Sequence, residues 1–253
     1  MLLVIDIGNT NIKGGVYDGA LLGTRRLPTP SHTESDFFAD WLKEVLGSTG
    51  ASGSAIEKTV VGSVVPSLDE PIAQACHSLV GHTPVFVTPD VNLPLSIEID
   101  RPEQVGADRI ANAAAGIKQF GAPCVIVDFG TATTFDCVSP DGAYVGGVII
   151  PGPQTAMADL AQRAAKLFAV EIEPPERVIG RSTEQALQSG FFHGTVGQVD
   201  FIIERIIAEL GGSGHHVIAT GGLAGRIEKH SRFIEAVVPD LTLDGLRIIG
   251  EMN

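Results

Sequence analysis

The sequence predicts an α/β protein of two related halves, with a nucleotide-binding cleft between them. An apolar, β-rich run followed by Asp-x-Gly occurs twice, at residues 3–11 and 125–133, and its aspartates, Asp6 and Asp128, are 122 positions apart in 253 residues. Repetition at that distance indicates two copies of one structural unit. Strands followed by helices also occur in the same order in both halves, which is typical of two α/β domains. We expect these domains to comprise residues 1–117 and 118–253.

The first half has the pattern β-β-β-α-β-α-β. Asp18-Gly19 lies between two apolar runs and predicts a hairpin turn. Residues 34–47 place apolar side chains on one helical face, and Gly47 ends the helix. The expected elements are strands at residues 2–7, 11–17, 20–27, 59–65 and 84–87, and helices at residues 34–47 and 68–80.

The second half repeats this pattern after a helix at residues 103–120. Its hairpin signal, Asp141-Gly142, comes one residue later after the acidic strand than the signal of the first half does. The expected elements are strands at residues 124–128, 133–138, 144–150 and 215–220, and helices at residues 153–168, 183–210, 223–232 and 242–252. The helix at residues 183–210 contains three glycines that could interrupt it, Gly190, Gly194 and Gly197.

Composition excludes several classes of protein. The net charge of −13 argues against a non-specific nucleic-acid binder, which needs basic patches for phosphate. No apolar run approaches the ~20 residues of a membrane span, and the N-terminus lacks the basic region of a signal peptide. The three cysteines have no C-x-x-C spacing, so neither a disulfide framework nor a zinc site is expected. A cytoplasmic protein fits these features.

Several common motifs are absent from the sequence. No G-x-G-x-x-G follows the first strand, and there is no Walker lysine motif, G-x-S-x-G elbow or cysteine nucleophile motif. The adjacent His215 and His216 lack the spacing of two ligands on one helix face. A nucleotide site must therefore be built from other residues.

The first Asp-x-Gly turn has the chemistry of a phosphate site. Gly8 permits a sharp turn whose N–H groups can face a phosphate, and Asn9 and Thr10 add side-chain donors. Lys13 returns on the next strand as a mobile cation for a β- or γ-phosphate. Asp6 could hold Mg²⁺ through water, because Mg²⁺ keeps several waters. An ordinary hairpin with a polar turn is the alternative interpretation.

The second turn differs from the first. Asp128 is followed by Thr131, Thr133 and Thr134 rather than by a lysine, so it favours a cation site near phosphate oxygens. We interpret Asp136, later on the same hairpin, as an ordinary solvated residue. Gly221-Gly222, after an apolar strand, would allow close approach of a flat base or ribose, and a plain strand–helix turn explains it equally well.

Between the two turns, Gly106-Ala107-Asp108-Arg109 opens the central helix. An Asp-Arg pair in a first helical turn is ordinary capping chemistry when taken alone. Its place on the segment that must bridge the halves favours a functional role. Asp108 could accept the proton of a substrate hydroxyl, and Arg109 could bind a substrate carboxylate.

With these motifs assembled, the chain resembles the type III pantothenate kinases, in the actin-like ATPase and sugar kinase superfamily of duplicated ribonuclease H-like domains. The resemblance extends over essentially the whole chain. It rests on five motifs: Asp6-x-Gly-Asn-Thr-Asn-x-Lys13, Gly106-Ala-Asp-Arg109, Asp128-Phe-Gly-Thr-Ala-Thr133, Gly146-Gly-x-Ile-x-Pro-Gly152 and Ile179-Gly-Arg-Ser-Thr183. It implies ATP-dependent phosphorylation of pantothenate to 4′-phosphopantothenate, the first step of coenzyme A synthesis.

The resemblance also implies roles for individual residues. It makes Asp108 the proton acceptor and gives Gly106, Ala107, Asp108 and Arg109 to pantothenate. It assigns Thr131 to ATP, and it assigns the ATP phosphates to the residues of the first turn: Asp6, Ile7, Gly8, Asn9, Thr10, Asn11, Ile12 and Lys13.

Cofactor and assembly are implied in the same way. The resemblance makes Asp128 a ligand of a monovalent cation, K⁺ or NH₄⁺, beside the Mg²⁺ that accompanies ATP. It makes Thr183 a substrate contact at a homodimer interface. One position departs from the family pattern: Ile99 stands where the family commonly has a Tyr, and the loss of that hydroxyl bears on the affinity for pantothenate.

Two alternatives remain open at the level of sequence. One is a kinase of the same superfamily with another small hydroxylated substrate, because a shared fold does not choose the substrate. The other is a non-catalytic nucleotide-binding regulator derived from the same family. Loss of Asp108 or Lys13 would favour the regulator, and both residues are present.

Overall fold

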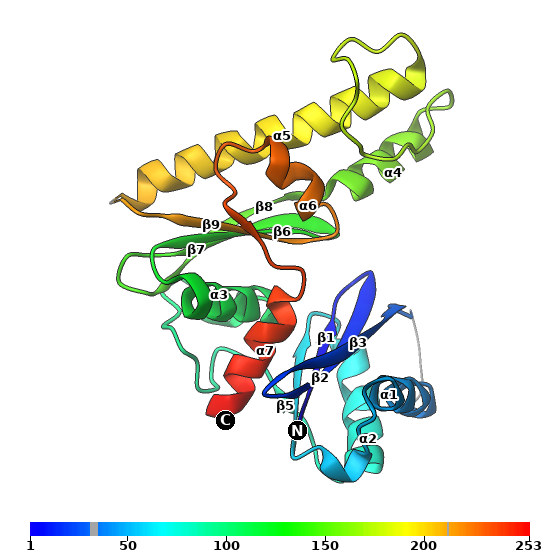
Figure 1. Cartoon of the computed structure of the whole chain (residues 1–253), viewed down its shortest axis with the longest axis vertical. Coiled ribbons are helices and arrows are strands. Elements are labelled where there is room, and N and C mark those ends of the chain that lie inside the picture. Colours follow the sequence, from blue (N-terminus) through cyan, green and yellow to red (C-terminus); the bar gives the residue numbers. More distant parts are fainter. Residues whose placement is uncertain (31–34, 212) are drawn as a thin grey trace. The chain divides into compact units, whose positions relative to one another are not determined.

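The computed structural model describes residues 1–30, 35–211 and 213–253 (Figure 1). The chain divides into two compact units, one formed by Met1–Lys118 with Asp240–Asn253 and the other by Gln119–Pro239. Each unit contains one five-stranded mixed sheet.

The first unit has the sheet order β3-β2-β1-β4-β5. β1 pairs antiparallel with β2 and parallel with β4, so it is the central strand. The strands are β1 Leu2–Ile7, β2 Asn11–Asp18, β3 Ala20–Pro28, β4 Lys58–Ser63 and β5 Val85–Phe86. The helices are α1 Ser35–Thr49, α2 Asp69–Val80, α3 Ala107–Phe120, which ends at the junction with the second unit, and α7 Leu241–Met252.

The second unit has the order β10-β9-β6-β7-β8 and repeats the first arrangement. Its central strand β6 pairs antiparallel with β7 and parallel with β9. The strands are β6 Cys124–Phe129, β7 Ala132–Val138, β8 Tyr144–Pro151, β9 His216–Gly221 and β10 Ala236–Val237. The helices are α4 Pro153–Arg163, α5 Thr183–Leu210 and α6 Ala224–Ile227. This repeated order confirms the predicted duplication.

Helices cover both faces of the first sheet. Alternate residues of β1, Leu3, Ile5 and Ile7, are buried in a core that α1 and α2 complete. On the other face α7 packs against β1 and β4. α7 crosses α3 at Gly245, where a side-chain Cβ would collide with the backbone carbonyl of Ala111. This close crossing fixes α7 in the first unit.

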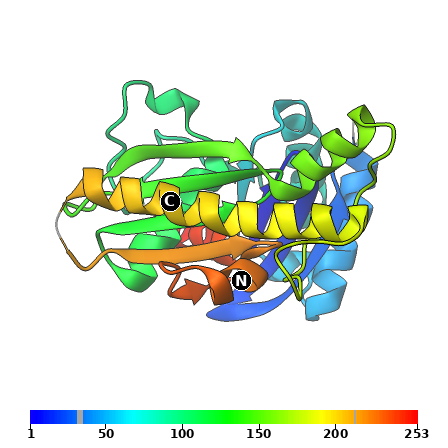
Figure 2. The same cartoon turned by 90° about the horizontal axis from the view of Figure 1, so that it is seen from above.

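The second sheet has its core beneath the long helix α5. Figures 1 and 2 show α5 running along one face of this sheet. Phe192, Val199 and Ile203 of α5 pack in one buried cluster with Val127 and Phe129 of β6. The helix is continuous across its three glycines, so the expected interruption is wrong; this packing and backbone hydrogen bonding outweigh the ~1 kcal/mol helix penalty of each glycine.

Most predicted elements agree with the structure to within a few residues, and the differences have local causes. The helix expected from residue 103 begins at Ala107, because Pro102–Gln104 forms a 3₁₀ turn. The helix expected at 223–232 is a short α6 followed by a 3₁₀ turn at Glu228–His230. The helix expected at 153–168 ends at Arg163. Residue 34, where we began the first helix, lies outside the described residues.

The C-terminal segment differs most from expectation. We assigned residues 118–253 to one domain, whereas Asp240–Asn253 belongs to the first unit. The reason is non-local packing: Leu246 of α7 lies against Gly62 of β4, and Gly250 lies against Val60. An amphipathic pattern shows that a helix packs on a sheet and does not show which sheet.

None of the helices in the described part of the chain combines the length and the apolar character needed to cross a bilayer.

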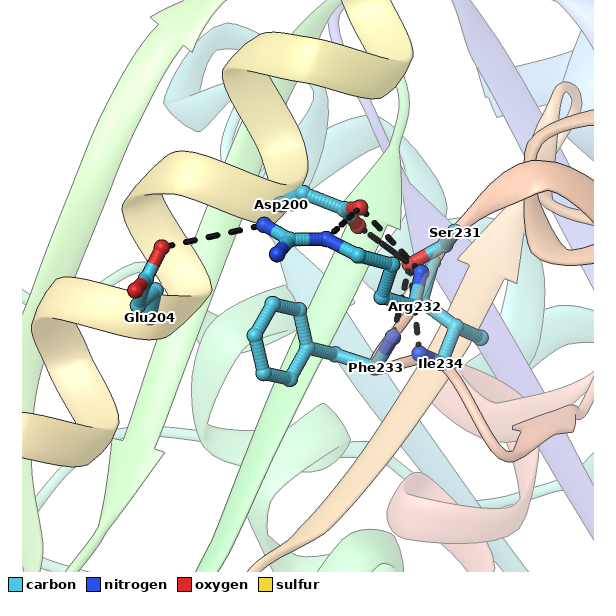
Figure 3. Close-up of polar contacts among 6 residues, drawn as sticks. All are labelled: Asp200, Glu204, Ser231, Arg232, Phe233 and Ile234. Carbon is cyan, nitrogen blue, oxygen red and sulfur yellow. Dashed lines mark hydrogen bonds and ion pairs between the residues drawn. The ribbon is translucent and has the colours of Figure 1, made fainter.

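A polar cluster ties α5 to the segment before β10 (Figure 3). The carboxylate of Asp200, whose side chain is only 8% exposed, accepts hydrogen bonds from Ser231 Oγ at 2.6 Å and from Arg232 N and Nε at 3.1 Å. Ser231 Oγ in turn accepts from the backbone N–H groups of Phe233 and Ile234. One buried carboxylate therefore holds the turn that leads into the edge strand.

We expect Asp200→Ala to lower the free energy of unfolding by about 1–3 kcal/mol, because it removes the nearly buried carboxylate that accepts hydrogen bonds from Ser231 and Arg232. Glu204→Ala is the matched control: Glu204 is 59% exposed and lies 3.7 Å from the same arginine. Its change should stay within about 0.5 kcal/mol. Urea unfolding of both variants checks this, and equal effects would contradict the structural role of Asp200.

Candidate functional site

The first Asp-x-Gly turn joins β1 to β2 and presents polar groups to solvent. Gly8 N donates to Asn11 O at 3.0 Å, which closes the turn. Thr29, just after β3, donates from its hydroxyl to Gly8 O at 2.6 Å and from its N–H to Thr10 O at 2.9 Å. Asn9 and Thr10 at the tip are exposed. Hydrogen bonds from Thr29 therefore hold one side of the turn, and its tip is exposed to solvent, as a phosphate site requires.

Lys13 lies directly beside Asp6, because the β1–β2 register pairs these two residues. Its ammonium forms an ion pair with the carboxylate of Asp240, at the residue that precedes α7. Asp240 is a candidate site residue that sequence reasoning missed. The two partners are 227 positions apart, so no local pattern could reveal the contact.

Burial and Asp244 of α7 both affect the ionisation of the Tyr17 phenol, which also lies on β2. Its hydroxyl donates to Asp244 Oδ1 at 2.8 Å. Desolvation and this carboxylate raise the pKa of the Tyr17 phenol well above its usual value, so the phenol stays neutral. The start of α7 is therefore anchored to β2 by both Asp240 and Asp244.

The Gly106–Arg109 motif forms the first turn of α3. Gly106 O accepts from the N–H groups of Arg109 and Ile110, both at 3.1 Å. Asp108 Oδ1 accepts from Arg109 N at 2.8 Å. The same oxygen lies over Gly106, where a Cβ would collide with it. Glycine at 106 therefore gives the Asp108 carboxylate its position.

The structure brings this motif next to the first turn. Gly62 of β4 is paired with Asp6, and a Cβ on Gly62 would lie 3.6 Å from Cβ of Ala107. Val64 makes a second link: its N–H donates to Ile7 O at 3.0 Å, and its side chain lies against Gly106. Two motifs a hundred residues apart thus meet within the first unit, as a site for phosphate and a second substrate would need.

The ionisation of Asp108 is unfavourable in this setting. Burial raises the pKa of its carboxyl above the ordinary value for aspartate, and the N–H and the guanidinium of Arg109 partly oppose the shift. A carboxylate held in this way accepts a proton more readily than a solvated one.

Ile99, the position that departs from the family pattern, lies in the irregular segment before the 3₁₀ turn at Pro102–Gln104 and is partly buried.

Backbone hydrogen bonds of Gly130 and Gly152 hold the second turn, between β6 and β7. Gly130 N donates to Ala132 O at 3.0 Å, and Thr131 O accepts from Gly152 N and from Thr155 Oγ1 at 3.0 and 2.7 Å. Thr131 itself is exposed. The glycine motif at residues 146–152 therefore shapes this turn.

Gly221 lies against the carboxylate of Asp128. It has φ +88°, and a Cβ there would lie 2.6 Å from Asp128 Oδ1. Gly222 N donates to Phe129 O at 3.1 Å. This close packing and the positive φ support the strand–helix turn, the second of our two interpretations of Gly221-Gly222, and the approach of a base or ribose stays a prediction.

Asp136 was expected to be solvated, and that expectation is wrong, since the residue is fully buried. The Tyr144 hydroxyl donates to Asp136 Oδ1 at 3.1 Å, and Thr134 Oγ1 lies 3.5 Å from Oδ2. Strand alternation could not have indicated this, because it places Asp136 on the face of β7 opposite the core residues Phe135 and Cys137.

Thr183 is the first residue of α5 and is exposed. Ser182 caps this helix by accepting from Gln185 N at 3.2 Å, and Gln185 Oε1 accepts from Arg181 N at 2.9 Å. The predicted site residues thus fall into two sets. Those of residues 6–13, Ile99 and 106–109 belong to the first unit, and Asp128, Thr131 and Thr183 belong to the second.

Among the described residues, no group of three or more His, Cys, Asp and Glu side chains could hold a metal ion. A Mg²⁺ ion at Asp6 would therefore take most of its ligands from nucleotide oxygens and water, which suits its preference.

Removing the charge of Asp108 should stabilise the protein at neutral pH. Because the folded carboxyl has the raised pKa, the folded state loses stability as pH rises from the ordinary aspartate value of about 3.9 through the folded value. The Asp108→Asn variant does not lose stability in this way, because its amide does not ionise. Its melting temperature should match that of the wild type near pH 4 and exceed it at pH 7. A constant difference across this range would contradict the burial effect.

Comparisons with known proteins identify a family that the chain resembles along its whole length. A family model for type III pantothenate kinase matches residues 2–205. The curated type III pantothenate kinase of Pelobacter propionicus is 44% identical over 254 residues, which cover 100% of both chains. That of Koribacter versatilis is 40% identical over 264 residues, covering 100% of this chain and 96% of the relative.

Solved structures show the same fold at low sequence identity. A protein from Campylobacter jejuni, described as a candidate Baf family transcriptional activator, is 20% identical with a TM-score of 0.61, covering 98% of this chain and 96% of its own. The activator of 2-hydroxyisocaproyl-CoA dehydratase from Clostridium difficile is 12% identical with a TM-score of 0.55, covering 98% and 92%. At this identity they support the fold alone, and they confirm the predicted class of two ribonuclease H-like domains.

Proposed function

The chain belongs to the type III pantothenate kinase family, and we propose that it transfers the γ-phosphoryl group of ATP to the primary hydroxyl of pantothenate. The product is 4′-phosphopantothenate, and the reaction is the first step of coenzyme A synthesis. The observation that supports this most directly is the meeting of the Asp6–Lys13 turn with Gly106–Arg109 inside one unit. It puts a phosphate-binding turn beside a carboxylate and an arginine.

Each residue of this arrangement has a definite task. The turn N–H groups and Lys13 bind the phosphates of ATP, and Arg109 binds the carboxylate of pantothenate. The pantothenate hydroxyl oxygen forms a bond to the γ-phosphorus as the bond to the bridging oxygen of ADP breaks. Asp108 accepts the hydroxyl proton. The transition state of such transfers is loose, so positioning and charge neutralisation supply most of the rate.

Lys13 must change partner in this scheme. Its ammonium is paired with Asp240 in the structure, and in the proposed reaction it turns toward the phosphates of ATP. Asp240 would thereby hold Lys13 beside the turn.

Two cations fit the donor groups of the chain. Mg²⁺ would lie near Asp6, mostly through water, and a monovalent cation, K⁺ or NH₄⁺, would lie at Asp128. When bound, they neutralise phosphate charge. We propose a cytoplasmic enzyme, as suits a biosynthetic kinase, with no nucleic-acid or membrane partner.

A second candidate is a kinase for another small hydroxylated compound, and a third is a non-catalytic nucleotide-binding regulator. The regulator is disfavoured because Asp108 and Lys13 are both present. Pantothenate-dependent turnover separates the pantothenate kinase from the other two candidates.

The deciding experiment measures ADP release by the purified protein with ATP, Mg²⁺, K⁺ and pantothenate. We expect turnover that depends on pantothenate. Asp108→Asn should lower kcat by about 10²–10⁴-fold with little change in ATP binding. Asp18→Asn, an exposed hairpin residue, is the matched control and should be unaffected. Turnover without pantothenate would exclude the proposed substrate, and normal kcat in Asp108→Asn would exclude the base.

We also propose that the protein is a homodimer that associates through the second unit. Ile179 and Val178 are 83% and 69% exposed, which is unusual for aliphatic side chains, and they precede Thr183. Nearby, a hollow of about 420 Å³ is lined by residues of β8, α4 and α5. Gly190 and Gly194 of α5 face open space there. A second copy would bury this surface beside Thr183.

Light scattering tests the dimer. The wild type should have twice the chain mass of 26.5 kDa, and Ile179→Glu should shift it toward the monomer, because a buried carboxylate is costly. Leu22→Glu is the control, since Leu22 is an exposed aliphatic residue of the first unit. A monomeric wild type, or equal behaviour of both variants, would contradict the proposal.

A further inference from the structure

The two sheets place different side chains beside their aspartates. In the first unit, Asp6 is paired with Lys13 on one neighbouring strand and with Gly62 on the other. Paired residues of adjacent strands direct their side chains to the same face of a sheet. The first row across the sheet is therefore Lys13, Asp6 and Gly62, and it places a lysine on the strand beside the aspartate, with its ammonium paired to Asp240.

The second unit has the equivalent row, with threonines in place of Lys13 and Gly62. Asp128 is paired with Thr134 on β7 and with Thr220 on β9. All three side chains lie on the face opposite the core residues Val127 and Phe135. The second row therefore offers a carboxylate between two hydroxyls.

The correspondence of Lys13 with Thr134 follows from strand register. The first turn closes Ile7 onto Ile12, whereas the second closes Phe129 onto Thr133, so the second turn is one residue shorter. Counting seven residues on from Asp128, as from Asp6 to Lys13, would lead to Phe135 instead, which is a core residue.

The second row is also partly buried and rich in oxygen. Thr220 is only 3% exposed, and Gly221 packs against Asp128 Oδ1. Thr134 Oγ1 lies 3.5 Å from Asp136 Oδ2, which adds a second carboxyl group. Hydroxyl and carboxylate oxygens are the ligands that hard cations take.

We propose that Thr134 and Thr220 complete the monovalent cation site of Asp128, and that the bound cation supplies there the positive charge that Lys13 supplies in the first row. This deepens the proposed function, since it rests on the cation expected at Asp128. A lysine at position 134 should then make the cation dispensable. The acceptance of NH₄⁺ expected for the family fits this view, because NH₄⁺ and a lysine head group have the same charge and the same donors.

The test measures cation binding without turnover. Thermal unfolding is followed in KCl and in choline chloride at equal ionic strength. The wild type should melt at least about 2 °C higher in KCl. Asp128→Asn and Thr134→Lys should both lose this shift, the former because a ligand is gone and the latter because the site already holds an ammonium.

Activity then separates these two variants. Thr134→Lys should turn over pantothenate equally well with K⁺ and with choline, whereas Asp128→Asn should be inactive in both. Thr134→Met is the matched control, because its stem resembles that of lysine without the charge; it should lose the K⁺ shift and stay inactive without K⁺. Retention of full K⁺ dependence by Thr134→Lys would overturn the proposal.

Smaller changes keep the test decisive if Thr134→Lys fails to fold. Thr134→Val and Thr220→Val each remove one hydroxyl and should raise the K⁺ concentration for half-maximal stabilisation about 10-fold or more. Wild-type K⁺ titrations in both would overturn the proposal. The binding test does not depend on the substrate. If these variants keep the wild-type K⁺ shift, the proposed cation site is wrong even when the protein phosphorylates pantothenate. If pantothenate is not phosphorylated, the proposed kinase activity is wrong, and the cation-binding result still stands.

Discussion

The pairing of one central strand with an antiparallel neighbour on one side and a parallel neighbour on the other governs the rest of this structure. Backbone hydrogen bonds fix which residues lie opposite one another, so they also fix what lies beside the aspartate at the end of the central strand. The chain uses this arrangement twice. The neighbours differ, and with them the chemistry of each copy.

In the first unit several distant segments converge on this arrangement. Gly62 leaves room beside Asp6 for Leu246 of α7, and Asp108 lies over the bare backbone of Gly106. α7, at the C-terminal end of the chain, packs on the same sheet, and Asp240, just before it, forms an ion pair with Lys13. The cost is the partial burial of the Asp108 carboxylate, which raises its pKa and suits it to accept a proton.

Much of the fold could be predicted from the sequence because its signals are local. Asp-Gly turns and alternating apolar residues define the hairpins, and Ser182 with Gln185 marks the start of α5. The errors arose where distant packing decides. The two-residue strand β10 exists because β9 pairs with it, and no periodicity can develop over two residues. Asp240 was missed for the same reason, since its partner is at the other end of the chain.

By itself, the sequence determined the duplication, the two Asp-x-Gly turns, the Gly106–Arg109 motif and the family, because each depends on residues that are neighbours along the chain. Only the tertiary structure decided that α7 belongs to the first unit and that Thr134, rather than Phe135, is the counterpart of Lys13. The physical reason is that a turn shortened by one residue changes the register, and a register shift of one residue exchanges the faces of a strand. The lysine-free copy of the turn is thereby a row of oxygens rather than an incomplete phosphate site.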